Sequence, residues 1–284
     1  MSCWETKIIE TARGNFEVFV KGEGHPICVT HHYSEFNATG DYFADSFTDN
    51  HKVYLVNLKE AGNSSKANAA HELSMFDAVY DLEAIRVELG YSKWSFAGHS
   101  TGGMIGVIYG IHFSNSLASL IIVGSAARQY ANSSSKCIYH PDHPRFDRMQ
   151  QLIEILKRSD LSPGEREQFS RERTKLSLFH PHKYEEYFSL GIHKKISSAR
   201  MNFFIREQMI FDVTRELGKI TTNTLIICGC HDVQCPLPFS IEMNELIPKS
   251  QLIIFNESNH YPFLEERLVF RQTVLAYLED ALSY

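Results

Sequence analysis

The feature that most constrains this chain is the glycine-rich stretch at residues 96–103, which has the sequence FAGHSTGG. Residues 93–97 are apolar and aromatic, as in a short buried strand, and residues 104–111 are typical of a closely packed helix. A strand, a tight turn and a helix around G-x-S-x-G form the arrangement that exposes a serine hydroxyl at the apex of the turn. The pattern therefore predicts that Ser100 is a nucleophile.

Composition and charge exclude several classes of function. The chain has 284 residues, of which 43% are hydrophobic and 22% charged, as in an ordinary globular protein. Its net charge is −6 and it has no basic run, so no nucleic-acid partner is expected. No apolar run is long enough to cross a bilayer, and no secretory signal is visible. We expect a cytoplasmic protein, a monomer or small homo-oligomer, that acts on a small molecule and does not bind membranes.

The six cysteines predict neither a disulfide framework nor a metal site. They stand at positions 3, 28, 137, 228, 230 and 235. Without an export signal they are expected to be reduced thiols. Cys228, Cys230, His231 and Cys235 form a local group, but the group lacks the paired C-x₂-C units of structural zinc sites. No metal and no cofactor are therefore expected.

Hydrophobic patterning divides much of the chain into alternating strands and helices. Residues 5–11 and 15–21 predict an antiparallel hairpin. Continuous apolar runs predict buried strands over residues 26–30, 52–57, 117–124, 224–229 and 251–255. A helix is predicted from Ser74, which has a capping-box-like partner in Asp77, to Gly90. This alternation predicts an α/β fold with a mostly parallel sheet of about eight strands.

The alternation is interrupted between residues 125 and 222, where only helical patterns occur. Helices are predicted over residues 144–159, 163–178, 181–189 and 198–217. Such a stretch is too long for one crossover connection. We therefore expect a helical lid at residues 127–217, inserted into a core formed by residues 1–126 and 218–284. The core then continues with helices near residues 237–246 and from about 262 to 282.

Two later loops supply the partners that a serine nucleophile needs. A serine hydroxyl is a poor nucleophile unless a base removes its proton and a carboxylate orients that base. Asp232 follows the strand at 224–229, and His260 follows the strand at 251–255. Open α/β sheets place their sites at the carboxyl ends of the strands. We therefore expect both side chains near Ser100.

Other interpretations of these residues stay open at this point. Asp232 could be only a helix N-cap, and Asp142, which follows the preceding strand, is a rival acid. His260 could be an ordinary loop histidine, although no other histidine follows the last strand. His99, beside the serine, is expected to be structural. The segment at residues 140–143, with sequence HPDH, is expected to be a surface turn. Position along the chain favours Asp232 and His260.

With these residues in place, the whole chain resembles the α/β-hydrolase superfamily. The turn around Ser100, the G-x-x-D loop at residues 229–232 and the H-x-P-x-x-E segment at residues 260–265 match the family pattern. The order of serine, acid and histidine along the chain is also that of the family. The resemblance implies that Ser100 is the nucleophile, that His260 is the general base and then acid, and that Asp232 orients the imidazole.

The resemblance also implies where the oxyanion hole lies. The family uses two backbone N–H groups, which correspond here to Thr101, after the nucleophile, and Tyr33, in the loop after the third strand. Such donors typically contribute about 3 kcal/mol each to transition-state stabilisation. The chain departs from the family pattern in having His31-His32 where His-Gly is usual, which removes the freedom of glycine to reach positive φ.

Within the superfamily, the chain is most similar to the lidded branch described as proline iminopeptidase-like. It lacks the HGGPG loop and the GGSWG turn of true proline iminopeptidases. Haloalkane dehalogenases and epoxide hydrolases carry aspartate where this chain has Ser100. The favoured activity is therefore that of a serine esterase or lactonase. The alternatives are an aminopeptidase of proline iminopeptidase type, a non-catalytic small-molecule-binding relative, and C–C bond or cyanohydrin cleavage by the same residues.

The inserted segment is rich in aromatic residues, which predicts a bulky and largely apolar substrate. The chain also resembles esterases that open macrolide lactones, so a macrocyclic lactone is one candidate. Glu185, Glu186 and Glu207 could then meet an amino sugar, although a solvated helix face is the simpler explanation. The side chains expected to bind substrate are His32, Phe179, Phe188, Phe203 and Phe204.

Overall fold

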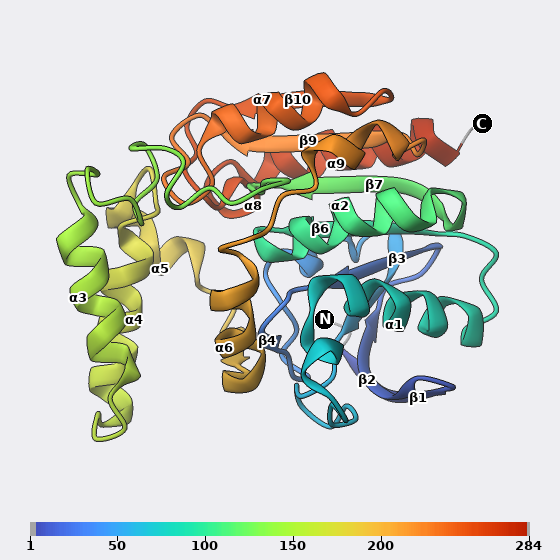
Figure 1. Cartoon of the computed structure of the whole chain (residues 1–284), viewed down its shortest axis with the longest axis horizontal. Helices are drawn as coiled ribbons and strands as arrows, with labels where there is room; N and C mark the ends of the chain where they lie inside the picture. Colours follow the sequence, from blue (N-terminus) through green and yellow to red (C-terminus); the bar gives the residue numbers. More distant parts are fainter. Residues whose placement is uncertain (1–3, 283–284) are drawn as a thin grey trace.

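The computed structural model describes residues 4–282, and an eight-stranded sheet lies at its centre (Figure 1). The strands are β1 (Glu5–Thr11), β2 (Gly14–Lys21), β3 (His25–Thr30), β5 (His51–Val56), β6 (Trp94–His99), β7 (Leu117–Val123), β9 (Thr224–Gly229) and β10 (Ser250–Phe255). Their order across the sheet is β1-β2-β5-β3-β6-β7-β9-β10. The β1–β2 and β2–β5 pairs are antiparallel, and the other pairs are parallel. The prediction of a mostly parallel sheet of about eight strands is confirmed.

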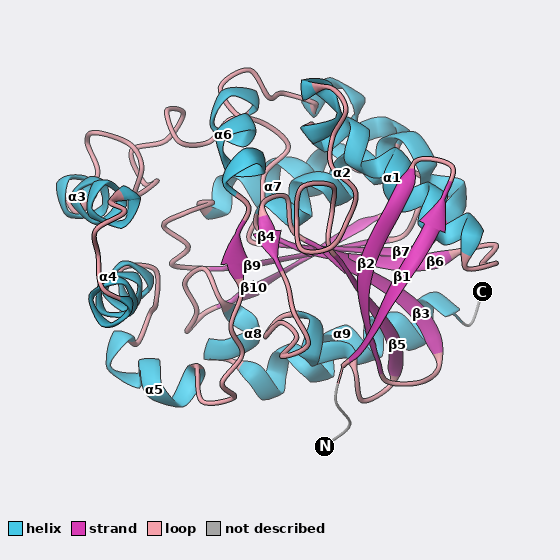
Figure 2. Cartoon of the chain, turned by 90° about the horizontal axis from the view of Figure 1, so that it is seen from below, coloured by secondary structure: helices cyan, strands magenta, loops and turns pink. Residues whose placement is uncertain are grey.

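Helices cover both faces of this sheet. One face carries α1 (Met75–Glu88), α2 (Thr101–Phe113) and α7 (Leu237–Leu246), and the other carries α8 (Pro262–Glu265) and α9 (Arg267–Leu282). Figure 2 shows the two groups of helices on opposite sides of the strands. Each face has its own cluster of buried apolar side chains. The chain therefore forms a three-layer core of helices, sheet and helices.

The first long helix begins and ends where its sequence predicts. The Ser74 hydroxyl accepts a hydrogen bond of 3.0 Å from the Asp77 N–H, which satisfies one of the free donors at the helix start. Gly90 follows the helix with a φ of 75°, a conformation that glycine adopts without strain. Leu82 and Ile85 on α1 are fully buried against the sheet. Local capping and packing thus favour the same helix.

The segment at residues 127–217 lies between β7 and β9 and forms no part of the central sheet. Its helices are α3 (Phe146–Lys157), α4 (Pro163–Lys175), α5 (Tyr184–Tyr187) and α6 (Ser198–Glu207). Both views show α3 and α4 packed side by side away from the sheet, with α6 closer to the core (Figures 1 and 2). No helix within residues 4–282 has both the length and the apolar character needed to span a membrane.

The structure corrects the expected elements at four places. A short strand, β8 (Lys195–Ile196), pairs antiparallel with β4 (Ser34–Glu35), although no strand was expected between residues 125 and 222. Two residues are too few to produce a detectable periodicity. The helix expected at 198–217 ends at Glu207. The helix expected at 181–189 is replaced by a 3₁₀ turn followed by the shorter α5, and the final helix is divided into α8 and α9 at Glu266. The 3₁₀ helices are η1 (Ala44–Phe47), η2 (Ala70–Leu73), η3 (Ser114–Ser116), η4 (Pro181–Lys183) and η5 (Thr214–Lys219).

Candidate active site

Ser100 lies at a strained turn between β6 and α2. Its φ of 56° and ψ of −121° are unusual for a residue other than glycine. A Cβ atom on Gly98 would lie 2.2 Å from the Gly102 carbonyl oxygen, and one on Gly102 would lie 2.3 Å from the Thr30 oxygen. Only glycine permits these backbone approaches. The turn therefore holds Ser100 beside the end of β3, with 8% of its surface exposed.

Asp232 and His260 form a buried hydrogen-bonded pair. The Nδ1 atom of His260 lies 2.9 Å from Oδ2 and 3.1 Å from Oδ1 of Asp232. The backbone N–H groups of Gln234 and Cys235 donate to Oδ1 at 2.8 and 2.9 Å, so the carboxylate is held on both sides. A Cβ atom on Gly124 would lie 3.0 Å from Oδ2, so the pair packs directly on the end of β7. A carboxylate at Nδ1 favours the tautomer that leaves Nε2 free to accept a proton.

The loop that carries His260 is held by a half-buried glutamate. Glu265 accepts hydrogen bonds from the backbone N–H groups of Asn259 at 2.9 Å and Tyr261 at 3.3 Å, on either side of the histidine. It also accepts one of 2.6 Å from the N–H of Phe179 in the inserted segment. His99 contacts the same loop, with its Nε2 atom 2.7 Å from the His260 carbonyl oxygen. The glutamate of the H-x-P-x-x-E segment thus links the His260 loop to the inserted segment.

Two backbone donors near Ser100 have no acceptor within residues 4–282: the N–H groups of Tyr33 and Thr101. A neutral histidine connects the two segments that carry them. Burial lowers the pKa of His31 well below its usual range. Its Nε2 atom lies 2.9 Å from the Thr101 hydroxyl, and its Nδ1 atom lies 3.0 Å from the Ser34 hydroxyl. His31 therefore joins the turn after β6 to the loop after β3.

Sequence reasoning missed Arg200, a fully buried arginine on α6 that binds this loop. Its Nε donates to the carbonyl oxygen of His32, and one Nη donates to His32 Nδ1 at 3.1 Å. The guanidinium also donates to the carbonyl oxygens of Lys59 at 3.1 Å and Leu73 at 3.3 Å. Burial lowers the pKa of Arg200 to about 10, so it remains charged at neutral pH. No local motif distinguishes such an arginine from those on a solvated helix face.

His32 and Glu207 complete a buried layer behind the loop. Because His32 Nδ1 accepts from Arg200, the neutral ring carries its proton on Nε2, which lies 3.5 Å from Glu207 Oε2. Burial lowers the pKa of His32 well below its usual range and raises that of Glu207 to about 7. The Glu207 carboxylate also accepts from the Met75 N–H at 2.9 Å. The His32 side chain therefore faces the protein interior.

The backbone also accommodates the unusual His31-His32 pair. Within residues 4–282, only Glu60 and Ser100 have positive φ among residues other than glycine. The loop after β3 therefore passes through His32 without the left-handed conformation that favours glycine.

A family model for the alpha/beta hydrolase fold matches residues 18–267. The chain belongs to this family. A solved alpha/beta fold family hydrolase from Bacillus anthracis str. Sterne is 42% identical to it, with a TM-score of 0.93 over 99% of this chain and 100% of that one. The pimeloyl-[acyl-carrier protein] methyl ester esterase of Vibrio cholerae serotype O1 is 21% identical over 91% of this chain and 96% of its own. Lipase 3 of a Moraxella species is 23% identical over 92% and 80%. The relatives of this α/β hydrolase thus include esterases.

The aromatic side chains expected to bind substrate lie in different surroundings in this α/β hydrolase. Phe204 is buried, and its ring centroid lies 5.3 Å from that of Tyr33. Phe179 stacks at 4.4 Å on a histidine ring of the Asp232 loop. Phe188 stacks at 4.6 Å on a tyrosine ring of α5. Phe203 is half-buried on α6. Phe204 thus packs against the side chain of Tyr33, the residue that carries one of the two candidate oxyanion donors.

The residues considered as alternatives lie elsewhere. The Asp142 side chain is 78% exposed and lies 3.8 Å from His140, in a turn of the inserted segment. The cysteines of the loop after β9 do not converge, since within residues 4–282 no three histidine, cysteine or acidic side chains form a metal-binding group.

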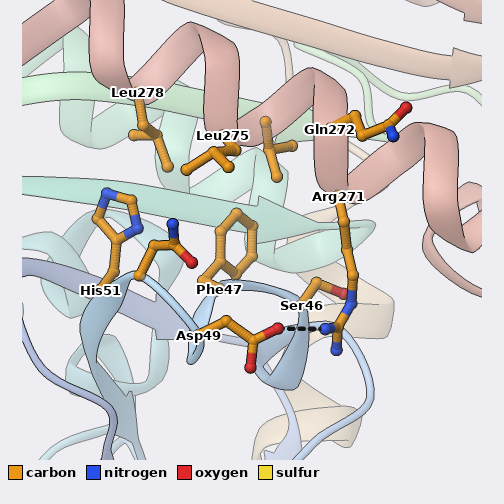
Figure 3. Close-up of a pocket in the computed structure, with 10 residues that line it drawn as sticks. Ser46, Phe47, Asp49, His51, Arg271, Gln272, Leu275 and Leu278 are labelled. Atoms are coloured by element: carbon orange, nitrogen blue, oxygen red, sulfur yellow. Dashed lines mark hydrogen bonds and ion pairs between the residues drawn. The ribbon is translucent and has the colours of Figure 1, made fainter.

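A hollow of ≈ 130 Å³ lies on the α9 side of this α/β hydrolase (Figure 3). Phe47, Leu275 and Leu278 provide its apolar wall, and Asp49 and Arg271 form an ion pair of 2.5 Å at its edge. None of the three residues expected to be catalytic lines it. The hollow is therefore separate from the candidate active site.

Proposed function

We propose that this protein is a serine hydrolase that cleaves a carboxylic ester or lactone through an acyl-enzyme on Ser100. The observation that carries the proposal is the buried Asp232–His260 pair, with a hydrogen bond of 2.9 Å and backbone donors fixing the carboxylate. The strained turn at Ser100, which is followed by the free N–H group of Thr101, supports the same assignment.

In this proposal, His260 Nε2 removes the proton of Ser100 as its hydroxyl oxygen attacks the ester carbonyl. The Tyr33 and Thr101 N–H groups stabilise the negative charge that forms on the carbonyl oxygen. His260 then gives the proton to the leaving alcohol, and an acyl group remains on the serine. Water attacks this acyl group with His260 again as base, which releases the acid and restores the serine. Asp232 holds the imidazole in the productive tautomer.

The aromatic surroundings of the site favour a bulky substrate with substantial apolar surface, and a macrocyclic lactone is one candidate. Two of the three carboxylates that could meet an amino sugar are engaged elsewhere, and the third, Glu186, is exposed. Glu185 is 67% exposed and pairs with Arg171 at 2.6 Å, and Glu207 binds the Met75 N–H. The site therefore offers no support for a cationic sugar, and we propose that the substrate does not depend on one.

The test is mass spectrometry of the protein after incubation with p-nitrophenyl esters of increasing chain length and with macrolide lactones. We expect a transient acyl adduct on the peptide that contains Ser100, and products that have gained one water. Turnover of small esters alone would keep the serine mechanism and exclude the macrocycle. A complete absence of acylation and turnover would contradict the proposal and favour a binding protein that retains the fold.

We further propose that Arg200 is a positioning residue for the oxyanion hole. The His32 carbonyl and the Tyr33 N–H belong to the same peptide group, which is trans and planar, so the two bonds point in opposite directions. When Arg200 holds the carbonyl from behind, the N–H must point away from Arg200. The charge-assisted bond also polarises the peptide, which strengthens the N–H as a donor.

Replacement of Arg200 with lysine is expected to lower kcat about 10²-fold, close to the loss of one oxyanion donor, with little change in KM. Lysine keeps the charge but cannot hold the carbonyl and ring nitrogen of His32 together. Two measurements test this expectation. The first is steady-state kinetics at a temperature below the melting temperatures of the wild type and of Arg200→Lys, and the second is the affinity of each protein for a boronic acid that mimics the tetrahedral intermediate. Arg206→Lys, on the exposed side of the same helix, is the control. Unchanged boronate affinity in Arg200→Lys would show that the arginine only stabilises the fold.

A further inference from the structure

Arg173, on the last turn of α4, is a cation without a counter-charge in the part of the chain that the structure describes. Its neighbours on the helix are paired: Arg171 with Glu185 at 2.6 Å, and Glu172 with Arg148. No carboxylate within residues 4–282 lies within ion-pair distance of Arg173. Its Nε atom is enclosed and has no hydrogen-bond partner in the same range. An enclosed guanidinium in this state carries a desolvation cost that no protein anion offsets.

The electrostatic neighbours of this guanidinium are tyrosines. Burial opposes its charge, while Tyr139, Tyr261 and Tyr33 favour it, and the Tyr139 hydroxyl forms a hydrogen bond with its side chain. Burial raises the pKa of Tyr139 and of Tyr261 to about 12, so both are neutral at physiological pH. Neutral hydroxyls can accept hydrogen bonds from arginine but cannot balance its charge. The surroundings of Arg173 are thus polar enough for an anion and lack one of their own.

The same tyrosines place Arg173 beside the candidate active site. Tyr33 provides one of the two free N–H groups, and the Tyr261 ring lies 5.2 Å from that of His260. The Tyr139 hydroxyl donates at 2.8 Å to the side-chain oxygen of Gln234, and the backbone N–H of Gln234 donates to Asp232. The segment just after α4 contacts the same loops, because the His260 N–H donates to the Ser177 carbonyl oxygen at 3.3 Å and the Gln234 side-chain amide donates to the Ser177 hydroxyl at 3.0 Å. Arg173 therefore lies at the end of α4 that adjoins the loops of His260 and Asp232.

We propose that Arg173 binds a carboxylate of the substrate, so that the preferred substrate is a half-ester of a dicarboxylic acid. The proposal rests on the serine hydrolase function proposed above and specifies its substrate class. The planar guanidinium matches a carboxylate through two parallel hydrogen bonds. The ester group of such a molecule then lies at Ser100, and hydrolysis consumes one water to give the dicarboxylate, the alcohol and one proton.

The experiment compares two p-nitrophenyl esters of equal length: the glutarate half-ester, which ends in a carboxylate, and the hexanoate ester, which ends in a methyl group. For wild type we expect the higher kcat/KM with the half-ester. In Arg173→Gln, kcat/KM for the half-ester should fall about 10- to 100-fold, as for loss of a hydrogen bond to a charged group, while the hexanoate value changes less than about threefold. Arg173→Lys should retain part of the preference. Arg171→Gln, on the same helix, is the matched control and should retain all of it.

Two outcomes would overturn the inference. Equal losses on both esters in Arg173→Gln would show that the arginine supports the fold, and equal kcat/KM values of wild type for both esters would show that no anion subsite operates. If wild type hydrolyses neither ester, the proposed function fails, and calorimetric binding of glutarate then decides the subsite separately. Binding to wild type that Arg173→Gln abolishes would support it, and absence of binding to wild type would refute it.

Discussion

Replacement of Ser100 with alanine is expected to lower kcat about 10⁶-fold on any ester that the wild type hydrolyses, as when a serine nucleophile is removed from a complete triad. The turnover that remains would come from the oxyanion donors and substrate binding alone. Ser100 has a backbone conformation with φ of 56°, and alanine adds no atoms to it, so the fold should persist. Burst-phase kinetics and labelling by a fluorophosphonate both measure the change, and both signals should disappear in the variant.

Ser92→Ala is the control, because this serine is exposed and lies before the same strand. It should label and turn over as the wild type does. Retained labelling of Ser100→Ala would place the reactive nucleophile elsewhere in the chain and remove the basis of the proposed mechanism. A fall in melting temperature that matches the loss of activity would instead show that the turn fails to form, and Ser100→Cys would then test the nucleophile with a retained side-chain volume.

The parts of the site that could be predicted from the sequence are those that follow strands. Ser100, Asp232 and His260 each lie in the turn or loop that follows an apolar strand, and parallel strands bring their carboxyl ends to one edge. Strong local patterns therefore locate both the element and the residue. The start of α1 also follows a local pattern, since Ser74 accepts from the Asp77 N–H as the sequence predicts.

The layer behind the site could not be predicted in this way. Arg200 lies 168 residues from the His32 carbonyl that it binds, and no pattern in either segment encodes the pairing. Glu207 has the sequence context of a solvated helix face, yet it is buried against the start of α1. Such contacts depend on how the inserted segment packs on the core. Tertiary packing also ends α6 at Glu207, where the helical pattern alone continues to residue 217.

The same limit applies to the charge of the substrate. Acidic residues of the inserted segment suggested a cationic group, because sequence reveals composition but not which side chains are already paired. In the structure Glu185 pairs with Arg171, whereas Arg173 two residues later has no such partner within residues 4–282. If Arg173 binds the substrate as we propose, the ligand is an anion and not the cationic amino sugar that the sequence left open.

Replacement of Asp232 with asparagine is expected to lower kcat about 10⁴-fold with little change in KM, because it reverses the tautomer of His260. The backbone N–H groups of Gln234 and Cys235 both donate to Oδ1, so the asparagine carbonyl oxygen should take that position. Its NH₂ group then replaces Oδ2, which lies 2.9 Å from His260 Nδ1, and donates to that nitrogen. The imidazole proton moves to Nε2. This nitrogen can then no longer accept the proton of Ser100.

Nitrogen-15 NMR of labelled histidine measures this exchange directly, since it distinguishes a proton on Nδ1 from one on Nε2. We expect the His260 signal to change tautomer in Asp232→Asn and to stay unchanged in Asp142→Asn, which removes the charge of the exposed rival acid. Full activity in Asp232→Asn together with a loss in Asp142→Asn would assign the orienting role to Asp142 and require the inserted segment to move onto the site. Loss of activity in Asp232→Asn without a change of tautomer would instead limit the aspartate to stabilising the charged imidazolium, because the orientation of the ring would then be set by its own loop.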